Sequence, residues 1–245
     1  MLIAPQNLSE NVRAVRERIA AAARSCGRSV DSVTLVAASK SQRPPLIEAA
    51  ASLGVTHFGE SYVQEALGKL EALAHLPLTW HFIGQIQANK TRAIAARFAW
   101  VHALDRLRLA QRLSAQRPFH APPLNVCIQV NLAAEASKAG APPEEVPALA
   151  QQIGALPGLR LRGLMCLPPE ETAVERQRYW FARLRELFEM LNARGAGLDT
   201  LSMGMSADLE AAVVEGATLV RVGTALFGPR PPAPSRPLPA QPNPP

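Results

Sequence analysis

Lysine, cysteine and aromatic residues are all scarce in this 245-residue chain, and each scarcity narrows what the protein can be. The three cysteines, Cys26, Cys127 and Cys166, are widely spaced and form no Cys-x-x-Cys pair, which argues against both a disulfide framework and a zinc site. The longest apolar runs, such as 33–38 and 126–130, are far shorter than the roughly 18 residues that span a bilayer. The N-terminus also lacks the pattern of a signal peptide. We therefore expect a cytoplasmic protein with no membrane partner.

The formal net charge of +6 does not come from basic clusters. Basic residues are scattered singly or lie in helix-like arrays, as at Arg176, Arg178, Arg183 and Arg185. Surfaces that bind nucleic acid instead group their basic residues and interleave aromatic ones. The pattern favours solvated helix faces and predicts no nucleic-acid partner.

Only four of the 26 basic residues are lysine, so we consider each lysine as a candidate reactive amine. A lysine amine can lose its proton and form a Schiff base with a carbonyl, whereas a guanidinium stays protonated in proteins. The four are Lys40, Lys69, Lys90 and Lys138. Lys69 lies in a helical stretch and is interpreted as an ordinary surface residue.

Short apolar runs alternate with amphipathic helical patterns, which is typical of parallel βα units. The eight predicted strands are 33–38, 55–58, 80–83, 100–103, 124–131, 161–166, 200–203 and 218–222. The predicted helices are 9–25, with Ser9 as N-cap, then 44–53, 60–73, 89–97, 105–116, 144–156, 172–194, with Gly195 just past its end, and 207–215. The pattern predicts an α/β fold, a single (β/α)8 barrel of the TIM type with an extra N-terminal helix that closes one end. A doubly wound open sheet gives the same alternation and is the alternative.

The composition changes after Gly228, Pro229 and Arg230. We predict one domain over residues 1–230, no second domain, and a proline-rich disordered tail over 231–245.

Residues that directly follow the strands are the first candidates for a site, because both folds bind ligands at the carboxyl ends of their strands. Ser206 follows strand seven through Gly204, and Gly223 and Thr224 follow strand eight. Free backbone N–H groups and hydroxyls in such loops bind phosphate. Ser206 as a plain helix cap, with the glycines as turn residues, explains the same segment equally well.

Lys40 follows the first strand and would face this phosphate site across the barrel mouth. A Schiff-base lysine opposite a phosphate site suggests pyridoxal phosphate. Arg221 on strand eight would reach the pyridine nitrogen and weaken ring protonation, or else form a structural ion pair. His57 and His81 lie within strands, where hydrogen-bonded core histidines are the commoner outcome.

Several segments together resemble the pyridoxal-phosphate homeostasis proteins, the YggS-like family. They are 37–40, 58–65, 80–90, 129–131, 163–165, 201–206 and 220–224, in the family's order across almost the whole predicted domain. The resemblance implies the barrel of the alanine racemase N-terminal domain without the second domain of the racemases.

The resemblance also implies site residues. Lys40 would carry the cofactor as a Schiff base, and Arg221 would face the pyridine nitrogen. The remaining cofactor contacts it implies are the phosphate ligands Ser206, Gly223 and Thr224, and the nearby side chains His81 and Asn89. The family usually has Asn where this chain has Ser61, although serine also donates a hydrogen bond.

The function implied is a pyridoxal 5'-phosphate-binding protein that stores or delivers the cofactor and keeps vitamin B6 and amino-acid pools in balance, without substrate turnover. No catalytic residue and no metal is expected, the protein would be a monomer, and apo-enzymes that use the cofactor would be its recipients. Lys90 and Lys138 would be secondary sites through which the cofactor passes during transfer.

Two enzymatic functions are the alternatives. An amino-acid racemase needs a second acid/base, usually a tyrosine from a second domain, and this chain has only Tyr62 and Tyr179. A cofactor-free Schiff-base aldolase would use Lys40 or Lys138 but leaves Arg221 without a role.

Overall fold

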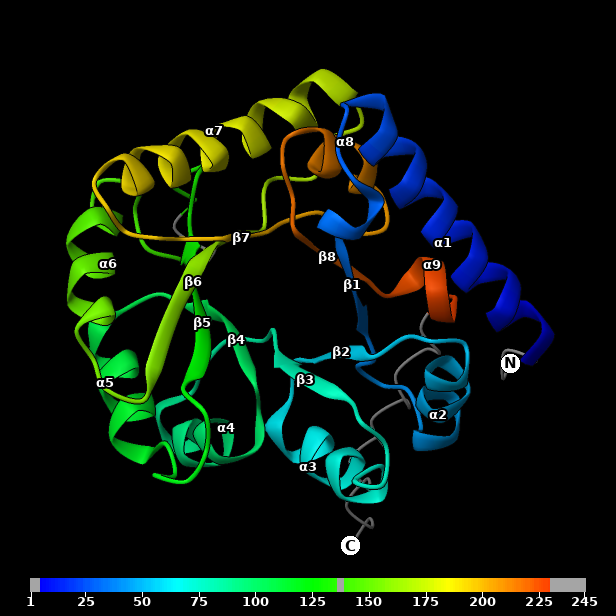
Figure 1. Ribbon diagram of the computed structural model, residues 1–245, viewed down its shortest axis with the longest axis horizontal. Helices are drawn as coiled ribbons and strands as arrows, with labels where there is room; N and C mark the ends of the chain where they lie inside the picture. Colours follow the sequence, from blue (N-terminus) through cyan, green and yellow to red (C-terminus); the bar gives the residue numbers. More distant parts are fainter. Residues whose placement is uncertain (1–4, 136–138, 230–245) are drawn as a thin grey trace, which may run out of the picture.

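Eight parallel strands close into a barrel in the computed structural model, which describes residues 5–135 and 139–229 (Figure 1). The strands are β1 (Thr34–Ala38), β2 (His57–Glu60), β3 (Thr79–Phe82), β4 (Trp100–Leu104), β5 (Leu124–Val130), β6 (Leu159–Cys166), β7 (Thr200–Ser202) and β8 (Leu219–Val222). Each strand pairs with the next, and β1 also pairs with β8, in register from Thr34 opposite Leu219 to Ala37 opposite Val222. The predicted barrel is confirmed, and the open sheet was the wrong alternative.

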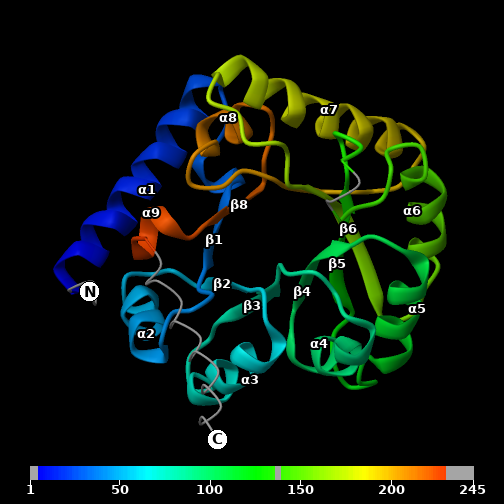
Figure 2. The same ribbon diagram turned by 180° about the vertical axis from the view of Figure 1, so that it is seen from behind.

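Helices form the outer layer of the barrel, as both views along it show (Figures 1 and 2). The α-helices are α1 (Pro5–Ser25), α2 (Pro44–Ser52), α3 (Val63–Ala72), α4 (Thr91–Arg97), α5 (Leu107–Gln116), α6 (Val146–Gly154), α7 (Val174–Ala193), α8 (Leu209–Val214) and α9 (Thr224–Phe227). Two 3-10 turns, η1 (Val30–Ser32) and η2 (Ala88–Lys90), precede β1 and α4. Hydrophobic side chains between the strands and this layer make up the main core.

Helix α7 follows the predicted amphipathic pattern. Phe181, Leu184 and Leu191 are buried at helical spacing against the barrel. Gly195, two residues past its end, has φ +84°, a left-handed conformation that glycine adopts without steric cost. The predicted helix end is confirmed.

Helix α1 differs from the prediction in two ways. It begins at Pro5, a residue suited to the first turn, so Ser9 lies inside the helix and is not its N-cap. It also lies in the outer layer against α2, α8 and α9, rather than across an end of the barrel (Figure 2). Helix α9, which follows β8, has 4 residues, and α1 packs beside it.

The inside of the barrel carries buried polar side chains where aliphatic ones usually fill the space. His102 on β4 contacts Ser202 on β7, and these strands are not neighbours, so the contact crosses the interior. Ala103, Cys127 and Met165 form a small apolar cluster beside it. Both Cys127 and Cys166 are fully buried.

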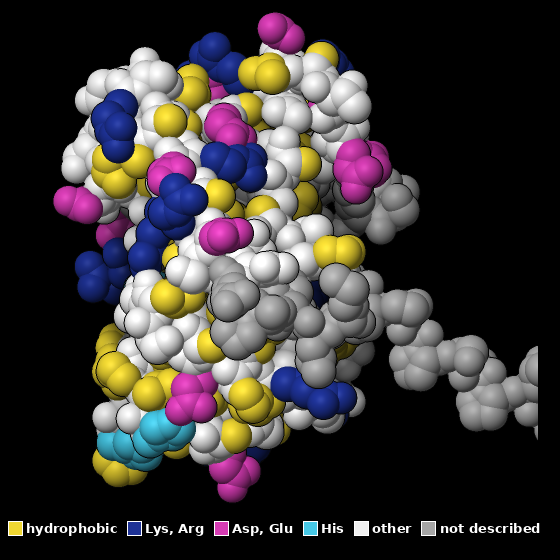
Figure 3. Space-filling model, turned by 90° about the vertical axis from the view of Figure 1, so that its right-hand side faces the viewer, with side chains coloured by type: hydrophobic (Ala, Val, Ile, Leu, Met, Phe, Trp, Pro, Cys, Tyr) yellow, Lys and Arg dark blue, Asp and Glu magenta, His cyan; other side chains and the backbone are white. Residues whose placement is uncertain are grey.

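The outer surface mixes charges. Figure 3 views the side of α1 and α2, where basic and acidic side chains are interspersed rather than gathered by sign. Within the described ranges, no helix combines the length and hydrophobicity that a bilayer span requires. The predicted tail, 231–245, lies outside the described residues.

Candidate functional site

Lys40 lies in the loop that leaves β1 at the carboxyl end of the barrel. Ser39 before it is fully buried, and Ser41 after it has φ +65°, in the left-handed region that non-glycine residues seldom occupy. Lys40 lines a cavity of about 200 Å³ with the loops that follow β7 and β8. Strands β7, β8 and β1 are consecutive around the barrel, so the fold brings these three loops together.

The loops after β7 and β8 supply a set of hydrogen-bond donors to this cavity. Ser206, Ala207, Gly223 and Thr224 line it, and their backbone N–H groups donate no hydrogen bond to another described residue. Gly204 lets the first loop turn, with φ +91°, and its carbonyl accepts from the N–H of Arg221 at 2.9 Å. Free backbone N–H groups that point into one cavity, together with nearby hydroxyl groups, can donate hydrogen bonds to a phosphate.

Ser206 does not cap the next helix. The alternative interpretation, in which Ser206 is only a helix cap, is therefore wrong. Helix α8 begins at Leu209, after Asp208. The hydroxyl of Ser206 instead accepts from the N–H of Ala225, at the start of α9, at 3.2 Å. The serine therefore ties the two cavity loops to each other.

Arg221 forms the inner end of the cavity. Its side chain is buried, and Nη1 donates to Ser202 Oγ at 2.7 Å while Nη2 donates to the carbonyl of Cys166 at 3.0 Å. No carboxylate of the described residues forms a salt bridge with it. Burial lowers the pKa of Arg221, yet a guanidinium stays protonated in proteins. Among the described residues, the structural ion pair considered for Arg221 is not found, and this buried cation lines the same cavity as Lys40.

A buried ion cluster lies directly behind the Lys40 loop. Lys69 Nζ donates to Glu60 Oε1 at 2.8 Å, to Glu65 Oε1 at 2.5 Å and to the carbonyl of Ser39 at 2.8 Å. Ser39 Oγ also donates to Glu60 Oε1 at 2.5 Å. The N–H of Ser41 donates to Glu65 Oε1 at 2.6 Å. The loop is thus held on both sides of Lys40.

This cluster corrects two predictions. Lys69 is not a surface residue, because its amine turns inward from α3 to two carboxylates. Glu60 does not start a helix but ends β2, with its side chain fully buried. Burial raises the pKa of Glu60, which the charge of Lys69 partly offsets. Glu60 Oε2 has no hydrogen-bond partner among the described residues.

Five of the seven predicted cofactor residues line the Lys40 cavity, and two lie elsewhere. The five are Lys40, Ser206, Arg221, Gly223 and Thr224. His81 is fully buried inside the barrel, where it bonds His57 and His102, as expected of a core histidine. Asn89 is exposed in η2. Cofactor contacts by these two stay predictions.

Lys90 and Ser61 do not line this cavity. Lys90 and Ser61 line a neighbouring cavity of about 300 Å³, together with Tyr62. Lys138 lies outside the described residues. The role of Lys90 in transfer remains a prediction.

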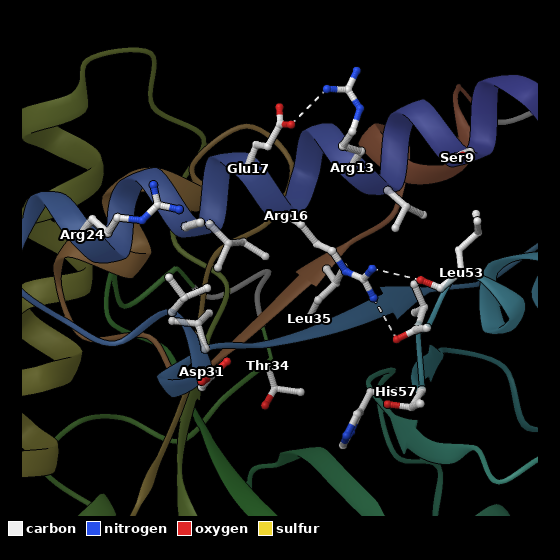
Figure 4. A pocket seen from close by; sticks show the side chains of 18 residues that line it. Ser9, Arg13, Arg16, Glu17, Arg24, Asp31, Thr34, Leu35, Leu53 and His57 are labelled. Carbon is white, nitrogen blue, oxygen red and sulfur yellow. Dashed lines mark hydrogen bonds and ion pairs between the residues drawn. The ribbon is translucent and has the colours of Figure 1, made fainter.

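A cavity of about 700 Å³ lies elsewhere, between α1 and the amino ends of β1 and β2 (Figure 4). Arg16 crosses it and donates to the carbonyls of Leu53 and Gly54 at 2.9 and 2.8 Å. None of the seven predicted cofactor residues lines it, whereas His57 does.

Sequence reasoning missed Lys69, Glu60, Glu65 and the pair His102 and Ser202. His102 could have been found from its position in the middle of the strand 100–104. A polar side chain buried inside a barrel needs a hydrogen-bond partner there.

Comparisons with known proteins show which family the chain resembles and which fold it shares. The family model described as "Alanine racemase, N-terminal domain" matches residues 3–231. The chain is 57% identical over 223 residues to the pyridoxal phosphate homeostasis protein of Pseudomonas aeruginosa, covering 91% of this chain and 96% of the relative. It is 46% identical over 227 residues to that of Escherichia coli K12, covering 91% and 97%. The solved structure of PipY from Synechococcus elongatus PCC7942 with PLP bound matches with a TM-score of 0.79 and 36% identity, over 90% of this chain and 100% of PipY.

Proposed function

The chain belongs to the family of the alanine racemase N-terminal domain, and on this premise we propose that it is a pyridoxal 5'-phosphate-binding protein that holds and delivers the cofactor, so contributing to vitamin B6 and amino-acid homeostasis. One observation carries the proposal: an amine, a buried cation and a cradle of free N–H groups line one cavity. When bound, the cofactor supplies an aldehyde that an amine can hold as a Schiff base.

The residues present fit such a group. Lys40 provides the amine, and the cluster of Lys69 and Glu65 fixes the loop on both sides of it. The N–H groups of Ser206, Ala207, Gly223 and Thr224 would hold the phosphate. Arg221 would donate to the pyridine nitrogen, where a permanent cation disfavours a further proton.

The same residues favour binding of the cofactor without turnover of a substrate. A donor cation at the ring nitrogen weakens the electron sink that amino-acid chemistry requires. A racemase needs a second acid/base, and neither tyrosine lines the Lys40 cavity: Tyr62 is exposed beside the neighbouring cavity, and Tyr179 is exposed on α7. These observations support a non-catalytic role.

The test is a visible spectrum of the full chain with added pyridoxal phosphate, before and after borohydride, followed by peptide mass mapping. We expect a yellow protein whose reduced adduct maps to Lys40. Lys40→Arg keeps the charge but cannot form the adduct, and Lys90→Arg is the matched control that should label as the parent does. A protein that stays colourless with excess cofactor would overturn the proposal and would favour the alternative function, a cofactor-free Schiff-base aldolase.

Turnover and delivery are tested separately. Incubation of the loaded protein with single amino-acid enantiomers should give no racemisation, and mixing with an apo-enzyme that uses the cofactor should restore that enzyme's activity. Sustained racemisation lost in Lys40→Arg would contradict the non-catalytic role.

A further inference from the structure

Side chains inside the barrel form a continuous hydrogen-bonded row that ends at Arg221. We call His57, His81, His102 and Ser202 the histidine row. The nitrogen distances are 2.9 Å from His57 Nδ1 to His81 Nε2 and 2.9 Å from His81 Nδ1 to His102 Nε2. His102 Nδ1 lies 2.7 Å from Ser202 Oγ, which accepts from Arg221 Nη1 at 2.7 Å.

The histidine row joins the two ends of the barrel. His57 is half-buried at the start of β2, at the edge of the cavity under α1, with its ring directed away from α1 (Figure 4). His81, His102 and Ser202 are fully buried. Arg221 lines the Lys40 cavity at the opposite end. The ring nitrogens face one another in pairs rather than converging on a point, so their partners are each other.

Arg221 determines the direction of these hydrogen bonds. A guanidinium only donates, so Ser202 Oγ is its acceptor, and the serine hydrogen needs an acceptor of its own. His102 Nδ1 is the one acceptor that the described residues offer that hydrogen. A neutral ring with an unprotonated Nδ1 carries its hydrogen on Nε2, which then donates to His81 Nδ1. His81 Nε2 in turn donates to His57 Nδ1.

The opposite direction is unfavourable. It would place N–H donors of the rings toward the guanidinium and leave the Ser202 hydrogen without an acceptor in a buried site. A cationic His81 would also carry a hydrogen on Nδ1, which would face the N–H on Nε2 of His102, so that two donors would meet without an acceptor. Burial, and then the neighbouring charges, lower the pKa values of His81 and His102 well below the ordinary value, which keeps both rings neutral.

We infer that His102, supported by His81 and His57, is a positioning residue for Arg221: it takes the Ser202 hydrogen, so that Ser202 Oγ accepts from Nη1 and aims the guanidinium into the Lys40 cavity. The inference rests on the proposed function in one respect, since Arg221 is taken as a cofactor contact. The bond direction itself is a property of the protein without cofactor.

The first experiment measures that direction directly. Long-range proton–nitrogen NMR spectra of the full chain with nitrogen-15 histidine, free of cofactor at neutral pH, distinguish the two neutral ring forms. Single His→Gln variants assign the signals, and the exposed His75 and His120 serve as references. We expect His81 and His102 each in the form with hydrogen on Nε2 alone. Hydrogen on Nδ1 of His102, or a cationic ring there, would overturn the inference.

The second experiment separates positioning from packing. In His102→Asn the amide oxygen can take the Ser202 hydrogen, whereas His102→Leu fills the space without an acceptor. We expect His102→Leu to weaken pyridoxal phosphate binding about ten-fold and to change its visible absorption, because the Ser202 hydrogen loses its acceptor and Ser202 Oγ no longer holds Arg221 Nη1 in one position. His102→Asn should bind within about two-fold of the parent. Equal binding by both variants, or equal loss in both, would contradict positioning.

Ser202→Ala covers the case in which His102→Leu does not fold, and it should reproduce the weaker binding and changed spectrum. Parent-like binding by Ser202→Ala would also count against positioning. Failure of the parent protein to bind pyridoxal phosphate would overturn the proposed function, while the ring forms still decide the bond direction. Normal binding with reversed ring forms would overturn the inference alone.

Discussion

Lys69 and Glu60 form a 2.8 Å ion pair that is almost completely buried, with side chains 5% and 0% exposed, directly behind the loop of Lys40. The same amine donates to the carbonyl of Ser39, so one buried charge neutralises a carboxylate and fixes the backbone next to the proposed cofactor lysine. Stability and site geometry therefore depend on one residue.

Lys69→Met should destabilise the protein strongly, because it leaves the Glu60 carboxylate buried without its cation. Loss of one partner of a buried pair costs about 3–5 kcal/mol. Urea unfolding followed by circular dichroism at neutral pH measures the loss, with Lys90→Met as the control. The double variant Lys69→Met/Glu60→Gln should recover part of it. A loss of under about 1 kcal/mol in the single variant would show that the pair contributes little.

Stability should fall as the pH drops below 6.5, the ordinary pKa of histidine. The folded protein keeps His81 and His102 neutral, because burial lowers their pKa values, whereas the unfolded chain takes up protons on both. Unfolding is therefore coupled to proton uptake. For each of the two histidines, the free energy of unfolding falls by about 1 kcal/mol between pH 6.5 and 5.5. The stabilisation is fully present above pH 6.5.

A variant pair isolates this effect from general acid sensitivity. His81→Gln removes one titrating group, so its stability should fall less steeply than that of the parent over the same interval. Ser202→Ala disturbs the histidine row but keeps all three rings, and its pH slope should match that of the parent. Identical slopes for His81→Gln and the parent would contradict the assignment.

Arg221→Met should separate stability from cofactor binding. The arginine is buried without a salt-bridge partner among the described residues, so Arg221→Met removes a costly buried charge and leaves no paired carboxylate without its cation. We expect pyridoxal phosphate binding to weaken at least about ten-fold while the melting temperature of the cofactor-free protein is unchanged or higher. Arg221→Lys, which keeps a charge but not the planar fork, is the comparison. Unchanged affinity in Arg221→Met would remove Arg221 from the site.

The phosphate cradle is tested with a ligand that lacks phosphate. Ser206→Ala removes the acceptor for the N–H of Ala225 and loosens the two loops, so binding of pyridoxal phosphate should weaken about ten-fold. Binding of pyridoxal, which has no phosphate, should hardly change. Absorbance titrations with both ligands measure this, and an equal loss for both would mean that the serine does not act through the phosphate.

Much of the fold was predictable because local patterns carry it. The strand runs and helical stripes specified an alternating α/β chain, and Gly195 marked the end of α7. The wrong details lie where tertiary contacts override local preference. Glu60 looks like the start of a helix, yet it extends β2 because Lys69 neutralises it inside the protein.

The sequence by itself determined the order of strands and helices, the scarcity of lysine and the residues that follow β1, β7 and β8. Since parallel strands end on one face, those residues had to meet there, and five of the predicted contacts line one cavity. Only the tertiary structure decided the rest. His102 and Ser202 are 100 residues apart and lie on strands that are not neighbours, so their 2.7 Å contact exists only once the barrel closes. The inward turn of Lys69 depends on the same closure, because a buried charge is stable only where the fold supplies its partner.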